Sequence, residues 1–299
     1  MTDVPPVALS KSSVFLRRLT STLALWSIIV AAVWTGHPLL FFGIIVGLGG
    51  LGLIEWRRMF GPTLEGWWRV WLYAVAAGYA GLVYWQSRSG QGSAPGLPEA
   101  VAIPLLLFGL FAGTLRRELE GRETLWRVLA AVMGFVYVAF LFSFAWRLLL
   151  VPDWDGAGSL PGVYYLVFVI AVTKFSDMGA YAVGVLFGRH KMIPHISPGK
   201  TWEGLGGAFL GAFTAAHGMA AVFGDRLPMI DHPHAAGLAL VLTVISVIAD
   251  LAESVVKRCL GVKDSGHFLP GIGGALDLID SLLFTAPAAW LYFHLVVKP

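Results

Sequence analysis

Charged side chains and glycines gather near the carboxyl end of this chain, in residues 254–280 (SVVKRCLGVKDSGHFLPGIGGALDLID). The segment holds three cations, three carboxylates and five glycines, whereas only 13% of the whole chain is charged. Carboxylates, cations and a glycine-rich turn together suit phosphoryl or nucleotidyl transfer, because such enzymes mainly position oxygen atoms and neutralise charge. The residue types and their spacing therefore predict a phosphate-handling site.

Acidic residues in and just upstream of this segment should share helical faces. Asp250, Glu253 and Lys257 are spaced so that all three lie on one stripe of a helix, and Asp277 and Asp280 again share a face. Carboxylates brought together from two helices repel in a low dielectric unless they are protonated or bridged by a metal. Because no His or Cys pattern accompanies them, Mg²⁺ is the favoured ion, with Asp250, Asp277 and Asp280 as its ligands.

Simpler roles stay open for several of these side chains. Glu253 and Lys257 are four residues apart and can pair on their own helix. Asp277 and Asp280 stand where acids cap a helix N-terminus and favour its dipole. Asp250 would still need a cation.

A polar loop, residues 188–207 (GRHKMIPHISPGKTWEGLGG), offers a second phosphate-binding candidate. Lys191 and Lys200 supply positive charge, and Ser197 and Thr201 supply hydroxyl groups. Thr201 also begins the pattern of a helix N-terminus, whose free N–H groups attract anions. The plainer interpretation is a cationic loop with a helix cap. The GKT triplet lacks the upstream glycine of a P-loop, so we set a Walker motif aside.

One further acid stands in an apolar stretch upstream of this loop, within KFSDMGAY. Lys174 and Asp177 are three residues apart and can neutralise each other on one helix face. Otherwise Asp177 points into a polar cavity that it shares with the acids above.

The elements that must position these residues are membrane helices. The 299 residues are 57% hydrophobic with a mean hydropathy of +0.74, which is typical of a chain in a bilayer. A hydrocarbon core about 30 Å thick needs about 20 apolar residues per helix. We therefore expect an all-α polytopic membrane protein with about nine spans, near 19–35, 38–54, 66–85, 99–114, 125–149, 163–187, 204–223, 235–255 and 277–297.

Charge asymmetry predicts the orientation of these spans. With the N-terminus on the cytoplasmic side, most of the 21 lysines and arginines fall in inside segments, and only Arg88, Arg226 and Lys298 fall outside. Nine spans place the C-terminus outside. The pI of about 9.0 then reflects membrane orientation and not nucleic-acid binding. The single cysteine excludes an intramolecular disulfide.

The polarity of the spans divides the chain into two parts. Residues 1–160 hold about five apolar spans and are expected to form a scaffold, whereas residues 161–299 hold about four spans with the ionisable residues and are expected to be the catalytic domain. Gly47, Gly49 and Gly52 match a dinucleotide-binding pattern, but they lie inside an apolar span and suggest helix packing instead. Gly207 and Gly211 receive the same interpretation.

Three segments resemble the phosphatidate cytidylyltransferases, also called CDP-diacylglycerol synthases. Residues 253–281 (ESVVKRCLGVKDSGHFLPGIGGALDLIDS) are similar to the C-terminal signature of that family, and DLAES precedes it as expected. Residues 177–207 look like the family's DTGAY and ISPxKTxEG segments. The residues in register with the signature are Ser254, Lys257, Arg258, Lys263, Asp264, Pro270, Gly273, Gly274, Asp277 and Asp280.

The resemblance covers residues 160–284 and departs from the family at two positions. Ile272 stands where the family commonly has His, and Leu278 where it commonly has Arg. The missing arginine removes one candidate phosphate contact, so either Arg258 or another cation takes its place, or the turnover or the substrate differs. Because the other signature residues are present, we expect activity to be retained.

The resemblance implies a reaction in which phosphatidic acid attacks CTP in the bilayer and yields CDP-diacylglycerol and pyrophosphate. It implies Mg²⁺ held by Asp250, Asp277 and Asp280, and leaves open a second, monovalent ion such as K⁺ and a homodimer. A bacterial inner membrane with the site facing the cytoplasm fits this reaction. The implied catalytic residues are Lys200, Lys257, Arg258, Lys263, Asp177 and Glu253, and the substrate-binding residues are Ser197, Thr201, Lys191, Gly273 and Gly274.

Other functions also fit a membrane chain with buried acids. A CTP-dependent polyprenol or lipid kinase shares the nucleotide and the setting. An ion-coupled transporter would likewise keep acids at membrane depth, but it would not depend on CTP. A CDP-alcohol phosphotransferase is also a membrane enzyme with an Asp-rich helix, but it is less favoured because its characteristic spacing of acids is not found in the sequence.

Overall fold

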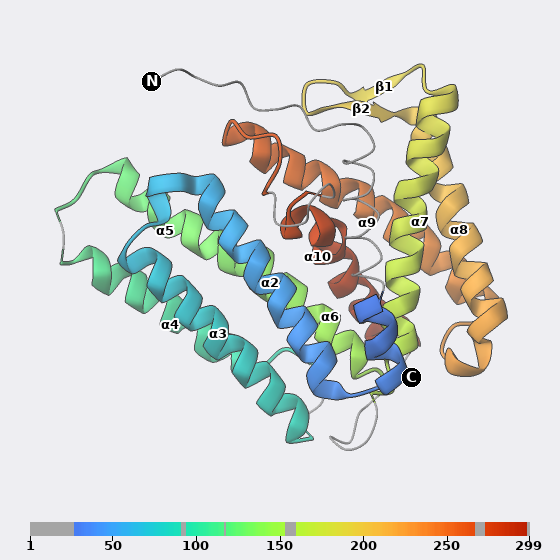
Figure 1. Cartoon of the computed structure of the whole chain (residues 1–299), viewed down its shortest axis with the longest axis horizontal. Coiled ribbons are helices and arrows are strands. Elements are labelled where there is room, and N and C mark those ends of the chain that lie inside the picture. The colour runs from blue at the N-terminus through green and yellow to red at the C-terminus, as the bar shows by residue number, and fades with distance from the viewer. Residues whose placement is uncertain (1–26, 91–93, 117, 153–159, 267–272, 298–299) are drawn as a thin grey trace.

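The computed structural model describes residues 27–90, 94–116, 118–152, 160–266 and 273–297. Within these ranges the chain is a bundle of long helices with one short two-stranded hairpin at its edge (Figure 1). This confirms the expected all-α membrane architecture. Its longest elements are α2 (Pro38–Phe60), α3 (Trp67–Arg88), α4 (Leu97–Thr114), α5 (Arg122–Gly134), α6 (Leu141–Leu149), α7 (Val163–Phe187), α8 (Trp202–Phe223), α9 (His232–Cys259) and α10 (Ala275–Tyr292).

Seven helices in the described ranges are long and apolar enough to cross a membrane. A π-helical stretch, Phe135–Phe140, joins α5 and α6 into one of these spans, Arg122–Leu149. The expected span at 66–85 is present as the helix α3, although it is not among the seven. The expected span at 19–35 lies mostly outside the described residues, and residues 27–35 are helical.

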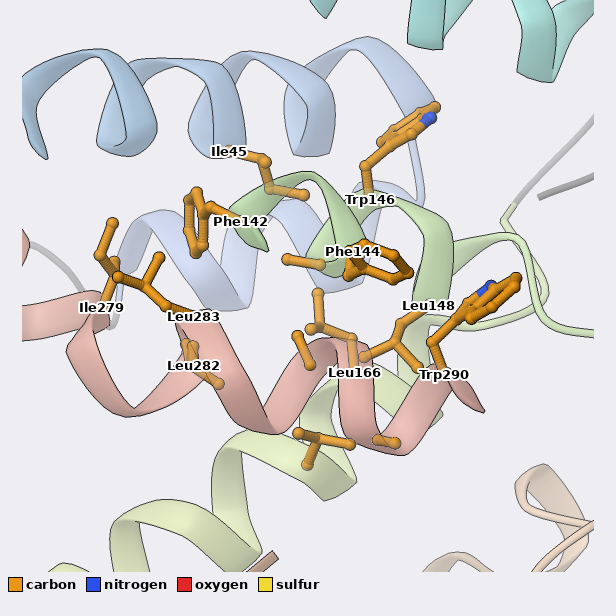
Figure 2. Packing of buried hydrophobic residues seen from close by; sticks show 14 of the residues in the cluster. Ile45, Phe142, Phe144, Trp146, Leu148, Leu166, Ile279, Leu282, Leu283 and Trp290 are labelled. Carbon is orange, nitrogen blue, oxygen red and sulfur yellow. The ribbon is translucent and has the colours of Figure 1, made fainter. Parts of the chain in front are cut away.

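Helix α10 lies at the centre of the bundle, where it packs against α9, α7, α6 and α2 (Figure 1). Figure 2 shows Ile45 of α2 and Phe142 of α6 facing Ile279 and Leu283 of α10. These four side chains are at most 8% exposed. Close side-chain packing is the main attraction between helices in lipid, so α10 joins the amino-terminal helices to the carboxyl-terminal ones.

Helices α7 and α8 approach each other through glycines. A Cβ atom on Gly207 would lie 2.3 Å from the carbonyl oxygen of Gly179, and one on Gly211 would lie 2.1 Å from that of Phe175. Only glycine permits such backbone contact, which confirms the small-residue interpretation of Gly207 and Gly211.

The glycines of α2 are less closely packed. A Cβ atom on Gly49 or Gly52 would lie 3.3 Å from Phe142 or Val138 respectively, whereas one on Gly47 would meet nothing within 4 Å. Helix packing therefore accounts for Gly49 and Gly52.

A hairpin connects α7 to α8. Its strands β1 (Lys191–Ile193) and β2 (Ser197–Thr201) pair antiparallel, with Lys191 opposite Thr201. Thr201 is the N-cap of α8, because its hydroxyl oxygen accepts a hydrogen bond of 3.0 Å from the Gly204 N–H. The expected helix start at Thr201 is confirmed, and the hairpin brings Lys200 to the side of α9.

Candidate active site

Three carboxylates from α9 and α10 converge in the described part of the chain. Asp250 and Glu253 lie on one face of α9, and Asp280 lies on the second turn of α10. One oxygen of each lies within 4.8 Å of the others. In this group, called the acidic triad below, Glu253 is 1% exposed and Asp280 is 9% exposed, whereas the side chain of Asp250 is 41% exposed. As the sequence predicted, Asp250 of α9 and Asp280 of α10 lie close together.

Glu253 is the most buried member of the triad. Its Oε2 atom accepts a hydrogen bond of 2.8 Å from Lys257 Nζ, which confirms the expected pair along the helix. Its Oε1 atom has no hydrogen-bond partner among the described residues. A buried oxygen without a partner is energetically costly, so this atom is available to a donor or a cation.

The cation for Asp250 comes from the hairpin. Lys200 Nζ lies 2.5 Å from Asp250 Oδ2 and 3.4 Å from the carbonyl oxygen of Val247. The side chain of Lys200 is 21% exposed, and that of Asp250 is 41% exposed. The loop predicted to carry phosphate-binding groups thus reaches the acids, although 50 residues separate Lys200 from Asp250 along the chain.

Asp277 lies outside the acidic triad and has partners of its own. Its Oδ1 atom accepts 3.0 Å from Lys257 Nζ, and its Oδ2 atom accepts 2.8 Å from the Gly274 N–H. It therefore caps the first turn of α10, which is the simpler role considered for it above. Glu253, and not Asp277, lies with Asp250 and Asp280 in the triad.

Helix α7 contributes a polar pair next to the same turn of α10. Lys174 Nζ lies 3.7 Å from Asp177 Oδ2, which confirms the expected pair, and Ser246 donates 3.3 Å to Asp177 Oδ1. Lys174 Nζ also lies 3.3 Å from both the Leu278 carbonyl oxygen and the Ser281 hydroxyl. Lys174 therefore lies close to the backbone of Leu278. At this position the family that the chain resembles commonly has arginine.

The remaining predicted residues lie at the end of α9 or just beyond it, directly before α10, or on the hairpin. Arg258 and Lys263 are exposed, and across the described ranges neither makes an ion pair. Lys191 is exposed on β1, and Ser197 is half-buried on β2. Gly273 has a φ of +126°, and Gly274 precedes the first residue of α10. Ile272 lies outside the described residues.

Comparison with known proteins gives the family of the chain. The model of the cytidylyltransferase family matches residues 16–296. The chain belongs to the cytidylyltransferase family. It is 40% identical over 169 residues to a phosphatidate cytidylyltransferase of Mycobacterium bovis, which is 56% of this chain and 51% of that protein.

Further relatives of this family member are bacterial. The chain is 41% identical over 142 residues to a phosphatidate cytidylyltransferase of Brucella suis, covering 46% of this chain and 50% of that protein. It is 37% identical over 166 residues to an uncharacterized Escherichia coli protein, covering 56% of this chain and 53% of that protein. The chain thus spans about half the length of the curated relatives it matches.

The contacts of Glu55 in this member of the cytidylyltransferase family were not predicted from the sequence. Glu55 of α2 is 2% exposed and accepts hydrogen bonds from Ser265, Ala275 and Leu276. Its only signal in the sequence is a lone acid within an apolar span, which is unfavourable in a membrane without a partner. Nothing in its neighbourhood along the chain indicates that the partner is α10.

Proposed function

We propose that this chain transfers the cytidylyl group of CTP to phosphatidic acid and so makes CDP-diacylglycerol and pyrophosphate. Membership of the cytidylyltransferase family supports the nucleotide and the type of transfer. The names of the Mycobacterium and Brucella relatives support the lipid. The observation that carries the proposal is the acidic triad, in which a buried oxygen of Glu253 has no partner among the described residues while Lys200 lies against Asp250.

The reaction needs no covalent intermediate on the protein. A phosphate oxygen of phosphatidic acid is already anionic at neutral pH and attacks the α-phosphorus of CTP. A new P–O bond forms while the bond from the α-phosphorus to the bridging oxygen breaks, and pyrophosphate leaves with that electron pair. The protein therefore has to align the two phosphates and neutralise their charge.

The cations divide into two groups on this proposal. Arg258 and Lys263 are exposed without ion pairs in the described chain, so they are free to bind phosphate oxygens, together with Lys191 on the hairpin. Lys200 and Lys257 are held against carboxylates, where they orient the acids and offer charge to one edge of the substrate. Ser197 and Thr201 of β2, with Gly273 and Gly274 directly before α10, remain the proposed substrate-binding residues.

The residues fit Mg²⁺, which we propose as the cofactor. Magnesium prefers a few carboxylate oxygens together with substrate phosphates, and the triad offers one oxygen each from Asp250, Glu253 and Asp280 within 4.8 Å. This set replaces Asp277 by Glu253 relative to the expectation from spacing. Bound there, the ion would neutralise charge on the triphosphate. A second, monovalent ion such as K⁺ stays a prediction.

Lys174 is the proposed substitute for the arginine that Leu278 replaces. Its ammonium group lies 3.3 Å from the Leu278 carbonyl oxygen, so it puts positive charge at that position from α7 instead of α10. Asp177 and Ser281 hold it there. On this proposal Lys174 supplies the positive charge that Leu278, in place of arginine, does not provide.

The proposed setting is the inner membrane of a bacterium, with the site facing the cytoplasm. The excess of lysine and arginine in the segments assigned to the inside supports it. CTP is available on that side, and the diacylglycerol tails of the substrate would remain in the bilayer. A homodimer and a division into a scaffold (1–160) and a catalytic domain (161–299) remain proposals.

Pyrophosphate release by the purified protein in nanodiscs tests the function. We expect release that requires both CTP and phosphatidic acid, and that falls at least about a hundredfold in Asp280→Asn, because one acidic oxygen of the triad is lost. Label on the α-phosphate of CTP should enter the lipid, whereas label on the γ-phosphate should not. Transfer of γ-label would instead identify a lipid kinase. Ion flux without any dependence on CTP would identify a transporter, and either result would overturn the proposal.

A further inference from the structure

Glu55 is an acidic residue in a helix long and apolar enough to cross a membrane, and its environment is unusual. It lies in the carboxyl-terminal half of α2 and is 2% exposed. A carboxylate at such a position is unfavourable unless it is fully hydrogen-bonded or paired. In the ranges that the structure describes Glu55 forms no ion pair, so its hydrogen bonds must compensate for the loss of water.

The partners of Glu55 are the free N–H groups of α10. Glu55 Oε1 accepts 3.0 Å from the Ala275 N–H, and Oε2 accepts 2.8 Å from the Leu276 N–H. These are the first two residues of the helix, whose N–H groups have no acceptor within the helix itself. The positive end of the helix dipole further favours an anion there. A side chain from α2 thus caps a helix that begins 220 residues later.

A third contact ties the preceding segment to the same carboxylate. Ser265, which is 5% exposed, donates 3.2 Å to Glu55 Oε2. Gly266 and Gly274 also border it: an added Cβ atom would lie 2.4 Å from Oε1 at Gly266 and 2.5 Å from Oε2 at Gly274. A side chain at either position would therefore displace the carboxylate from where it lies.

We infer that Glu55 is a positioning residue for the acidic triad. Its carboxylate fixes where the first turn of α10 starts, and that turn carries Asp277, with Asp280 one turn further on. A shift of the helix start would move Asp280 relative to Asp250 and Glu253, which belong to α9. Glu55 touches no member of the triad, so it acts only through α10. The inference rests on the proposed function where it concerns catalysis, and on geometry alone where it concerns the helix.

Amide hydrogen exchange of residues 273–281 in nanodiscs tests the geometric part. Glu55→Gln keeps the size of the side chain but replaces one acceptor oxygen by an NH₂ group. That donor would face one of the two backbone N–H groups, which would then lose its acceptor. We expect faster exchange in this segment, and a smaller change in the same direction in Ser265→Ala, which removes one hydrogen bond and leaves the carboxylate in place. Leu110→Ala serves as the control, because it opens a fully buried site on α4 and lowers stability without touching Glu55.

Metal dependence tests the link to the triad. In the pyrophosphate assay we expect the Mg²⁺ concentration for half-maximal rate to rise about tenfold in Glu55→Gln, as is common when a group behind the ligands is removed. Mn²⁺ binding followed by electron paramagnetic resonance should weaken in parallel, and Leu110→Ala should change neither quantity. The inference is overturned if Ser265→Ala and Glu55→Gln leave exchange at 273–281 unchanged, or if they change it no more than Leu110→Ala does.

The two proposals fail in different ways. A wild-type protein without CTP-dependent pyrophosphate release would end the proposed function, while the exchange comparison would still decide the role of Glu55. Conversely, an active wild-type enzyme with unchanged exchange and unchanged metal dependence in Glu55→Gln would end only the inference about Glu55. Should Glu55→Gln fail to fold, Ser265→Ala, which removes one hydrogen bond to the carboxylate, decides the question.

Discussion

At the scale of single residues, five acids of similar sequence context have separate environments. Asp250, Glu253 and Asp280 bring oxygens within 4.8 Å of one another, whereas Asp277 accepts from Lys257 and from the backbone of Gly274. Asp177 of α7 is held by Lys174 of the same helix and by Ser246 of α9. Each acid therefore has its own set of partners, and substitutions of individual acids should have different consequences.

Asparagine substitutions at Asp277 and Asp280 should separate these roles. Asp280→Asn is expected to raise the requirement for Mg²⁺, because it removes a charged oxygen from the triad. Asp277→Asn weakens a helix cap and one contact of Lys257, so it should lower stability by about 1 kcal/mol and change the metal requirement much less. Rates over a Mg²⁺ titration, with thermal unfolding measured alongside, check this. Equal shifts in the metal requirement would show that Asp277 is a ligand after all.

Lys200 is expected to support catalysis through its positive charge and through its contact with Asp250. Lys200→Met leaves Asp250 without its cation and removes a group from the substrate side, so kcat/KM for CTP should fall at least about a hundredfold. Lys200→Arg keeps the charge and should recover part of that loss. Steady-state kinetics with both variants measure the difference. A Lys200→Met enzyme with a wild-type rate would remove the hairpin from the mechanism.

At the scale of elements, the pairing of α7 with α8 determines where the hairpin lies. Gly179, Gly207 and Gly211 let the two backbones touch, and the short hairpin between the helices then lies beside α9 with Lys200 facing Asp250. The position of a catalytic candidate on a loop thus depends on small residues inside the membrane spans.

A larger side chain at this crossing should separate the two helices. Gly207→Val places methyl groups where a Cβ atom alone would lie 2.3 Å from the Gly179 carbonyl oxygen, and it should lower stability by about 1–3 kcal/mol. Gly206→Val is the matched control, since a Cβ atom at Gly206 meets nothing within 4 Å. Thermal unfolding in the same detergent compares the two variants. Equal losses would attribute the effect to helix propensity and not to the crossing.

At the scale of the whole molecule, the amino-terminal helices are held together by a buried polar group of their own and joined to the rest through α10. Arg147 of α6 is 1% exposed and pairs with Glu99 of α4, which also accepts 2.8 Å from the Tyr79 hydroxyl of α3. Glu55 then connects α2 to the start of α10. Residues 1–160 therefore contact the start of the helix that carries Asp280.

Breaking the Arg147–Glu99 pair should destabilise the protein as a whole. Arg147→Met leaves the Glu99 carboxylate without its cation. Removing one partner of a buried ion pair lowers the free energy of unfolding by about 3–5 kcal/mol. Adding Glu99→Leu removes the stranded charge and should restore part of the stability. Chemical unfolding in mixed micelles measures both. If the double variant is no more stable than the single one, the pair is not the source of the loss.

Much of this protein could be predicted from local pattern. Apolar runs of about 20 residues determine which segments are membrane helices, because a spanning helix has to satisfy its backbone hydrogen bonds within itself. Spacings of three and four residues determine that Asp250 and Glu253 share a face, and Thr201 marks the start of α8 by its hydroxyl. These features depend only on neighbours along the chain.

Only the tertiary structure decided which faces meet. Asp277 and Asp280 share a face of α10 but lie on successive turns. Asp277 therefore binds Lys257, whereas Asp280 lies beside Asp250 and Glu253. The approach of Lys200 to Asp250 and of Glu55 to α10 depends on how helices distant in sequence cross. A side chain's periodicity gives its direction from its own helix axis, but its partner depends on the packing of all the helices around it.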